Sequence, residues 1–365
     1  MIDDTVFIKN LITEICPEVV YWKEYLKGDD LKVAIIGFGK MGILHSGILN
    51  LLIPGIVKCI VDRSFLLTFG ASKMIKNIKA YRDIDRMLRE VEPEIVYVTT
   101  PVDSHYPVVK NLVEYGIRHV FVEKPPTINC KQLEELISIK RADQHVMVGF
   151  QKRYALPFRH AKLLIDHGVI GDLWSVHAYT KSGDVRESTA RFDRLGRGVL
   201  LDLGVHIIDL LVWFFGIKHI VYAEAKSIYT RVDDTFKAEL VGENNAKVLV
   251  EITWSDSEYR MPETCIKMYG SLGTISVTED YLKVKTEIEH PLINDKKEMI
   301  LYKPHYYQGI PPVNLADPEY TIENMHFLKS IHENESPLTS IESSLETMKL
   351  IDELYDKSER KYITA

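Results

Sequence analysis

The run Leu31-Lys-Val-Ala-Ile-Ile-Gly-Phe-Gly-Lys-Met-Gly42 decides the fold of this chain. Its first half, residues 31–36, is short, apolar and rich in β-branched side chains, which is typical of a buried parallel strand. The second half spaces its glycines as G-x-G-x-x-G, and a helical pattern follows through Leu52. Such glycines permit a tight turn and the close approach of a phosphate to free N–H groups at the helix start. The strand, the glycines and the helix together predict a dinucleotide-binding unit.

The next strand carries an acidic residue that fits this turn. Residues 56–61 form a second apolar run that ends in Asp62, twenty residues after Gly42. An acidic side chain at this distance accepts hydrogen bonds from the ribose hydroxyls and repels a 2′-phosphate, which favours NAD. Arg63 follows directly and would accommodate NADP. We therefore expect NAD as the cofactor, with NADP as the alternative.

Strands and helices alternate from residue 31 to residue 150. After the first two strands, the apolar runs 94–99, 118–122 and 145–149 alternate with helical patterns. This order predicts an α/β architecture, with a Rossmann-type doubly wound parallel sheet over residues 31–150. We expect residues 1–30 to be an N-terminal extension with one short amphipathic helix, whose role the residues do not show.

The second half of the chain has a different pattern. Successive alternating runs between residues 220 and 285 predict a large, mainly antiparallel sheet, one face buried and the other solvated or used for association. Helical patterns accompany it before residue 166 and over 321–333 and 341–357, whereas 290–318 is expected to be irregular. We expect residues 151–365 to form an α+β domain that binds substrate and mediates oligomerisation.

The composition argues against several classes of protein. The chain has 365 residues, enough for two domains, and its formal net charge of −7 leaves no basic footprint for nucleic acid. No basic run indicates a membrane surface, and the first residues are acidic where a secretory signal is basic. The four cysteines are far apart and outline neither a zinc site nor a disulfide framework. We expect a cytoplasmic protein without a metal, nucleic-acid partner or membrane partner.

The stretch Gly198–Gly216 is apolar except for Asp202, His206 and Asp209. On a single helix these three residues, at i, i+4 and i+7, share one narrow stripe. Ionisable groups along one face argue against a membrane span and favour a buried helix. Because buried charges require partners, the stripe either lines a site or pairs within the core.

Two loops follow strands of the predicted parallel sheet, where ligands of such sheets bind. One contains Thr100-Pro101 and His105, which we expect at a helix start near the cofactor. The other contains Glu123 and Lys124, followed by two prolines that restrict the backbone. Partial burial would lower the pKa of the Lys124 ammonium group and suit it to proton transfer. The alternative is an edge lysine that pairs with Glu123.

Five motifs follow one another along the chain: Gly37-Phe-Gly-Lys-Met-Gly42, Thr100-Pro101 with His105, Glu123-Lys-Pro125, Val148-Gly-Phe-Gln-Lys-Arg-Tyr154, and Gly198-x-x-x-Asp-x-Gly-x-His-x-x-Asp209. A later segment, Tyr269-Gly-Ser-Leu-Gly273, adds a sheet motif. Together they resemble the glucose–fructose oxidoreductase / inositol dehydrogenase / rhizopine catabolism (Gfo/Idh/MocA) family of NAD(P)-dependent oxidoreductases. The resemblance extends over nearly all of the chain from Leu31 onward. Two features depart from it: Val102 stands where the family usually has Asn, and the N-terminal extension is atypical.

The resemblance implies hydride transfer between a nicotinamide and a secondary alcohol or ketone of a sugar, polyol or sugar derivative. It also implies a cis Lys124–Pro125 peptide, a substrate cleft lined by Lys124, Asp202 and His206, and a homodimer or homotetramer. The cofactor-binding residues that we expect are Gly37, Phe38, Gly39, Lys40, Met41, Gly42, Asp62, Arg63, Thr100, Pro101, His105, Glu123 and Lys124. The expected substrate-binding residues are Lys124, Arg153, Tyr154, Asp202 and His206.

The chemistry of these side chains suits alcohol oxidation. His206 is a natural general base because an unperturbed imidazole titrates near neutral pH. Asp202 would orient that imidazole or hold a sugar hydroxyl, and Lys124 would stabilise the developing alkoxide. We therefore predict Lys124, Asp202 and His206 as catalytic residues. For Arg153 and Tyr154, contact with substrate or cofactor and structural packing stay equally open.

Three other functions stay open beside the sugar dehydrogenase or reductase. The first is a non-catalytic regulator that binds dinucleotide and sugar. The second is an NAD-dependent glycoside-cleaving enzyme, and the third is an imine or biliverdin-type reductase. The arginines of the loop 184–197 favour a mixed-charge surface over recognition of an anionic substrate. They are Arg186, Arg191, Arg194 and Arg197.

Overall fold

The computed structural model describes residues 4–19, 31–74, 77–183, 185, 197–306 and 317–362, without the side chains of Asp4, Ser72, Met74 and Tyr362. Contacts within the chain divide it into two compact units. The first unit, called the nucleotide unit below, comprises residues 21–151 and 313–345. The second, called the sheet unit, comprises residues 1–20, 152–312 and 346–365. The segments 1–20 and 313–345 therefore pack with units other than their neighbours in sequence.

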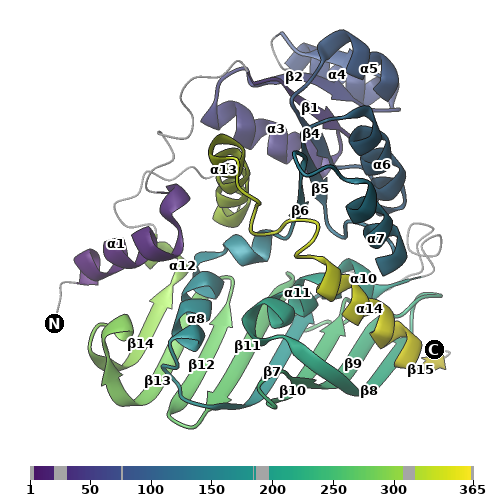
Figure 1. Ribbon diagram of the computed structural model, residues 1–365. Coiled ribbons are helices and arrows are strands. Elements are labelled where there is room, and N and C mark those ends of the chain that lie inside the picture. The colour runs from purple at the N-terminus through teal and green to yellow at the C-terminus, as the bar shows by residue number, and fades with distance from the viewer. Residues whose placement is uncertain are drawn as a thin grey trace. The chain divides into compact units, whose positions relative to one another are not determined.

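The nucleotide unit is built on a six-stranded sheet in the order β3-β2-β1-β4-β5-β6 (Figure 1). Each strand pair is parallel, which confirms the predicted doubly wound sheet. Strands β1, β4 and β5 are buried along their whole length, as their apolar runs predict. The strands are β1 (Val33–Ile36), β2 (Val57–Val61), β3 (Lys79–Tyr81), β4 (Ile95–Val98), β5 (His119–Glu123) and β6 (His145–Gly149).

Helices connect these strands, all but α4 at positions that the sequence predicts, and one further helix comes from the end of the chain. That helix, α13 (Pro318–Glu333), packs against α3 and β6. After it, the main chain of residues 339–341 continues the sheet edge, because Val148 N–H donates to the Thr339 carbonyl over 2.8 Å. The connecting helices are α3 (Lys40–Leu52), α4 (Phe65–Met74), α5 (Ile84–Val91), α6 (His105–Tyr115) and α7 (Cys130–Ile139).

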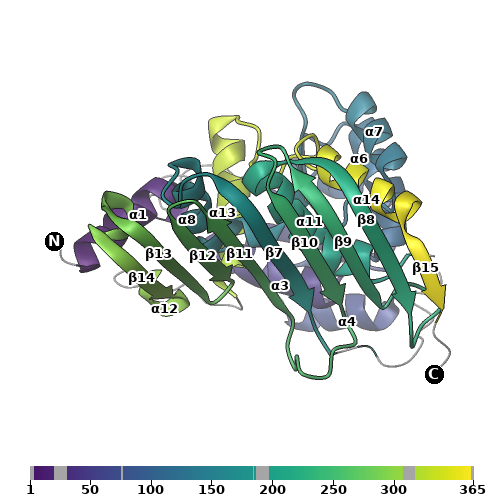
Figure 2. The same cartoon turned by 90° about the horizontal axis from the view of Figure 1, so that it is seen from below.

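The sheet unit is built on a nine-stranded sheet in the order β14-β13-β12-β11-β7-β10-β9-β8-β15, seen face-on in Figure 2. Neighbouring strands are antiparallel except for the pairs β7–β10 and β8–β15, so the expected mainly antiparallel sheet is confirmed. The strands are β7 (Leu173–Lys181), β8 (Ile217–Ser227), β9 (Thr235–Gly242), β10 (Lys247–Thr253), β11 (Glu263–Gly270), β12 (Gly273–Thr278), β13 (Tyr281–His290), β14 (Lys296–Tyr302) and β15 (Glu359–Tyr362).

The helices of the sheet unit lie on one face of this sheet (Figures 1 and 2). Residues along β9 and β10 alternate between buried and more exposed positions, as expected for a sheet covered on one side. The helices are α8 (Leu156–Asp166), α10 (Val199–Asp202), α11 (Gly204–Phe215), α12 (Lys303–Tyr306) and α14 (Leu345–Lys357).

The single helix expected over residues 198–216 is wrong in one respect: the segment forms two helices. The helix α10 ends at Asp202, Leu203 separates it from α11, and α11 begins at Gly204. A Cβ at Gly204 would lie 2.8 Å from Ile252 on β10, so the glycine allows the start of α11 to approach the sheet closely. Leu203 itself has helical backbone angles, with φ −92° and ψ −41°, so Asp202 and His206 stand on two successive helices separated by a single residue.

The N-terminal extension contains the expected amphipathic helix, α1 (Asp4–Ile15). Its apolar side chains Ile8, Leu11 and Ile12 are buried, and the helix packs against α8 and α12 of the sheet unit. The four cysteines are free and buried. Among the described helices, none combines the length and the apolar character needed to cross a bilayer.

One pair of histidines makes the nucleotide unit sensitive to acid. His119 and His145 begin the neighbouring strands β5 and β6, with ring centroids 5.5 Å apart. Burial, reinforced by the neighbouring His145, lowers the pKa of His119 to about 4. An unfolded histidine titrates higher, so the unfolded state gains a proton first as the pH falls.

We therefore expect stability to fall between about pH 7 and about pH 5, with His119 responsible for about 1–2 kcal/mol. Urea unfolding of the wild type and of His119→Gln at both pH values measures this share. The variant should lose less stability on acidification, whereas His219→Gln, at an exposed position of β8, should behave as the wild type. Equal losses in the wild type and His119→Gln would contradict the assignment.

Candidate functional site

The three glycines of the loop between β1 and α3 differ in their surroundings: two are tightly packed by the backbone, and the third faces open space. Gly37 has a φ of +91°, and a Cβ there would lie 2.8 Å from the backbone of Thr99 and Thr100. A Cβ at Gly42 would lie 2.1 Å from the Gly37 carbonyl, so neither position accepts a side chain. At Gly39, by contrast, a Cβ would meet no described atom within 4 Å. Gly39 is also the N-cap of α3 and supplies no side chain to its first N–H groups, which leaves them for a phosphate.

Asp62 lies beside this loop at the end of β2. Its Oδ2 accepts a hydrogen bond from the N–H of Phe38 over 2.7 Å, and Oδ1 accepts one from the N–H of Ser64 over 2.8 Å. These bonds fix the carboxylate next to the loop, and each oxygen retains a lone pair for a ribose hydroxyl. The neighbouring Arg63 has an exposed side chain. The acid and the glycines that the sequence predicts as cofactor residues are thus brought together.

His105 joins the two loops that follow β4 and β5. It is the first residue of α6, is 1% exposed, and places Nε2 2.7 Å from the Thr100 carbonyl and Nδ1 2.8 Å from the Pro125 carbonyl. Burial lowers the pKa of His105, while both carbonyls favour N–H groups on the ring. Thr99 adds a third link, because its hydroxyl donates to the Gly37 carbonyl over 2.6 Å.

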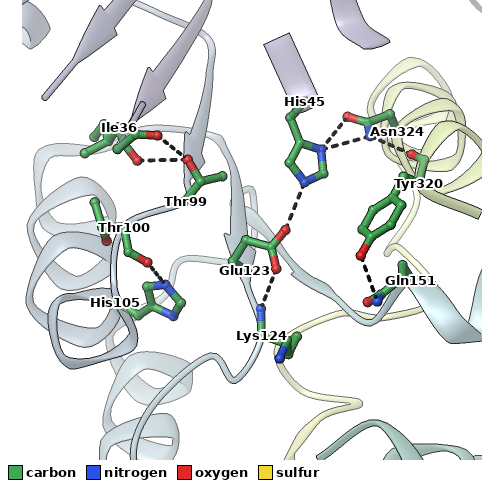
Figure 3. A network of polar contacts seen from close by, with 11 residues as sticks. Ile36, His45, Thr99, Thr100, His105, Glu123, Lys124, Gln151, Tyr320 and Asn324 are labelled. Atoms are coloured by element: carbon green, nitrogen blue, oxygen red, sulfur yellow. Dashed lines mark hydrogen bonds and ion pairs between the residues drawn. The ribbon is translucent and has the colours of Figure 1, made fainter. Parts of the chain in front are cut away.

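Glu123 is held by a network that sequence reasoning missed (Figure 3). Its Oε1 lies 3.0 Å from Nε2 of His45, a fully buried residue of α3. The other ring nitrogen, Nδ1, lies 3.0 Å from Nδ2 of Asn324 on α13. Nδ2 also donates to the Tyr320 carbonyl over 2.7 Å.

The shorter contacts of this network agree with one tautomer of His45. If Nδ2 of Asn324 donates both to the Tyr320 carbonyl and to His45 Nδ1, the imidazole carries its own hydrogen on Nε2, while Oδ1 of the same amide lies 3.3 Å from Nδ1. That hydrogen points to the Glu123 carboxylate, whose Oε2 in turn accepts the N–H of Lys124 over 3.2 Å. The helix of the glycine loop and the strand end that bears Lys124 are thereby joined through one buried carboxylate.

Lys124 follows β5 directly and is half-buried. The Lys124–Pro125 peptide bond is cis, as the resemblance implied. Of the three predicted catalytic residues, Lys124 belongs to the nucleotide unit, whereas Asp202 and His206 belong to the sheet unit.

Asp202 and His206 belong to the sheet unit, and Asp233 fixes the helix that ends at Asp202. The carboxylate of Asp233 accepts the N–H groups of Gly198 over 2.8 Å and of Leu200 over 2.9 Å, so it caps α10 from another segment. Burial raises the pKa of Asp233 to about 6. Sequence reasoning missed this cap because the aspartate lies more than thirty residues further along the chain.

Arg153 and Tyr154 are engaged within the sheet unit. The guanidinium of Arg153 donates from Nε and Nη2 to the two oxygens of Asp209 over 2.6 Å each. Tyr154 is fully buried, with the guanidinium of Arg159 4.9 Å above its ring. These contacts favour the structural packing that the sequence left open beside substrate contact. Arg197 likewise pairs with Asp352 over 2.5 Å, and Arg186, Arg191 and Arg194 lie outside the described residues.

Glu323 is a buried acid beside the Glu123 network. It is fully buried on α13, and neither carboxyl oxygen has a hydrogen-bond partner among the described residues. Burial, followed by the charges of Glu123 and Glu319, raises the pKa of Glu323 well above its usual value. The folded state therefore keeps this proton at pH values where the unfolded chain has released it.

We expect Glu323→Gln to stabilise the protein relative to the wild type, increasingly so as the pH rises above about 4.5, by up to about 1.4 kcal/mol per pH unit. The amide copies the neutral acid and has no proton to lose. Urea unfolding of both proteins at about pH 5 and about pH 8 measures the difference. The exposed Glu335→Gln is the control, and a pH-independent difference for Glu323→Gln would contradict the assignment.

Comparisons with known proteins agree with this geometry. Residues 31–150 match the model of the oxidoreductase family with an NAD-binding Rossmann fold, and residues 158–276 match the GFO/IDH/MocA C-terminal domain. Myo-inositol 2-dehydrogenase of Thermotoga maritima is 24% identical over 187 residues, 51% of this chain and 55% of that protein. D-glucoside 3-dehydrogenase of Escherichia coli is 25% identical over 210 residues, 56% of this chain and 60% of that protein.

A solved structure of levoglucosan dehydrogenase with NADH and levoglucosan has a TM-score of 0.77 and 20% identity, covering 90% of this chain and 96% of the other. This likeness shows the fold. The chain spans about half the length of the first curated relatives that it matches. The chain belongs to the GFO/IDH/MocA oxidoreductase family, and its residues 31–150 form the NAD-binding Rossmann domain of that family.

Proposed function

We propose that this protein transfers a hydride between NAD and a secondary alcohol or ketone of a sugar, polyol or sugar derivative, with NADP as the second cofactor. One observation carries the proposal: in an NAD-binding domain, the buried network of Glu123 and His45 holds Lys124 at the end of a central strand. Ligands of open parallel sheets bind at such strand ends. The relatives named for inositol and glucoside oxidation support a carbohydrate as substrate.

The chain's own residues would manage the proton of the reaction. The nicotinamide, when bound, supplies the hydride chemistry. Oxidation of an alcohol also requires its hydroxyl proton to leave, and His206 would accept it as general base. Asp202 would orient the imidazole or hold a neighbouring sugar hydroxyl, and Lys124 would stabilise the negative charge that develops on the oxygen. In the reverse direction the same groups would donate a proton to a ketone.

Two features of the nucleotide unit suit NAD, the open start of α3 and the Asp62 carboxylate beside it. Pyrophosphate would lie over Gly39 at the start of α3, and a ribose would meet Asp62. The contacts of Phe38, Thr99 and His105 keep these loops in place.

We further propose a cytoplasmic homodimer or homotetramer. The four free, buried cysteines suit a reducing compartment. The helices of the sheet unit lie on one face of its sheet. Some large apolar side chains of the strands are exposed to solvent, among them Trp174 at 61% and Val221 at 60%. Exposed apolar side chains of this kind suit association between copies.

Loss of His206 or Lys124 should abolish most turnover. We expect His206→Asn and Lys124→Met each to lower kcat by about a hundredfold or more, the usual contribution of a positioned proton-transfer or oxyanion group. A screen of sugars, polyols and nucleotide sugars, read by the absorbance of reduced nicotinamide, supplies the substrate. His219→Asn and Lys131→Met change exposed residues of the same types and should retain wild-type kcat. Retention of kcat by His206→Asn and Lys124→Met would refute their roles.

Asp62 should determine the preference between the two cofactors. In Asp62→Ala the carboxylate that would accept the ribose hydroxyls is absent, and so is its repulsion of a 2′-phosphate. We expect NADH to bind about tenfold or more weakly and the preference over NADPH to shrink or reverse. Fluorescence titration with each reduced cofactor measures both constants, with the exposed Asp85→Ala as control. Unchanged affinities in Asp62→Ala would place the ribose elsewhere.

A further inference from the structure

Buried charged groups connect the N-terminal segment to helix α11 inside the sheet unit. Four of them are Glu18, Arg159, Arg153 and Asp209, each at most 8% exposed. They form one series of contacts in which two acids flank two bases: Glu18 pairs with Arg159, Arg159 bonds to the main chain of Arg153, and Arg153 pairs with Asp209. Charges so deeply buried are stable in the fold only when each is paired.

The first half of the series centres on Arg159 of α8. Its Nη1 lies 2.7 Å from Oε1 of Glu18 and donates to the Ile15 carbonyl over 2.9 Å. Its Nε donates to the carbonyl of Arg153 over 3.1 Å. The N-terminal segment therefore fixes the one side chain that holds the main chain of Arg153 in place.

The second half begins at the Arg153 side chain. The guanidinium makes its two 2.6 Å hydrogen bonds to Asp209, and Thr347 of α14 donates to the same carboxylate over 3.1 Å. Asp209 lies three residues after His206 on α11, so the two side chains project from adjacent turns of one helix. This bidentate pair therefore ties the orientation of α11, the helix that bears His206, to the Arg153 side chain.

Removal of the Glu18 charge would disturb the whole series. Arg159 and Arg153 would then share a single buried carboxylate, Asp209, and Arg159 would have reason to shift toward solvent or toward Asp209. Either movement of Arg159 would break its hydrogen bond to the Arg153 carbonyl and shift Arg153, the residue that holds Asp209. The nucleotide unit contains none of these four residues.

We propose that the N-terminal segment, residues 4–19, positions α11 for catalysis, and that Glu18 and Arg159 are positioning residues for His206. The role of His206 rests on the proposed function. The segment precedes the NAD-binding domain in sequence but packs with the other unit, so its loss affects turnover and leaves cofactor affinity unchanged.

The kinetic test compares Glu18→Gln, Glu18→Asp and the exposed Glu14→Gln of α1. Misplacement of a reacting group by a fraction of an ångström is sufficient for Glu18→Gln to lower kcat about tenfold or more. Its Kd for NADH should stay within about twofold of the wild type. Glu18→Asp keeps the charge and should recover most of kcat, and Glu14→Gln should match the wild type. Wild-type kcat in Glu18→Gln, or a parallel loss of NADH affinity, would overturn the proposal.

A second readout needs no substrate. Hydrogen exchange of the NADH-bound protein should show the amides of α11 exchanging about tenfold faster in Glu18→Gln, while those of α3 keep their wild-type rates. Unchanged exchange in α11 would overturn the positioning role. If no sugar or polyol is turned over by the wild type but α11 exchanges faster in the variant, the proposed function fails and the link from Glu18 to α11 stands. Should Glu18→Gln not fold, Arg159→Lys keeps the charge but loses the forked contacts to the N-terminal segment and to the Arg153 carbonyl, and it should accelerate exchange in α11 in the same way. Unchanged exchange in α11 of this variant would overturn the proposal.

Discussion

The carboxylate of Glu123 connects the parts of the nucleotide unit that must act together. One carboxylate oxygen contacts His45 of the helix that follows the glycine loop. The other accepts the backbone N–H of the next residue, Lys124. His45 is enclosed by the rings of Tyr97 and Phe121, with centroids 5.4 and 4.9 Å away, and it is anchored by Asn324 from the end of the chain. A buried polar network is stable only when its donors and acceptors match, and a hydrogen on His45 Nε2 matches the contacts to Glu123 and to Nδ2 of Asn324. The constraint therefore fixes where a lysine stands relative to a phosphate-binding helix.

In the sheet unit, too, buried carboxylates hold the segments that carry proposed catalytic residues. Asp233 caps α10, which ends at Asp202, and the Arg153–Asp209 pair holds α11, which bears His206. Neither acid is a predicted catalytic residue. Asp233 holds the main chain of α10, Asp209 holds α11 through Arg153, and both acids are buried. In each unit, a segment that carries a proposed catalytic side chain is thus held by a buried carboxylate that is not itself a predicted catalytic residue.

The sequence predicts those features that depend on local patterns. The glycine turn, Asp62 and the strand before Lys124 follow from runs of neighbouring residues, and the family motifs add the cis peptide. Local patterns do not show that residues 313–345 pack with the nucleotide unit. The strands β3, β14 and β15 escape prediction because they are edge strands with few buried side chains. The partners His45–Asn324 and Gly198–Asp233 are separated by 279 and 35 residues along the chain. A periodic pattern of apolar residues predicts local structure and does not show which distant residues come into contact. The break at Leu203 escapes for a similar reason, since it follows from the contact of Gly204 with a distant strand.

The central claim is that a hydride moves between a carbohydrate carbon and NAD on this chain. The most direct measurement uses the alcohol found in the substrate screen, with deuterium at the oxidised carbon, and analyses the NADH formed by mass spectrometry. The account predicts that each NADH carries one deuterium and that kcat falls by a primary isotope effect when hydride transfer limits the rate. NADH without deuterium, or cofactor binding without reduction across the whole carbohydrate screen, would contradict it.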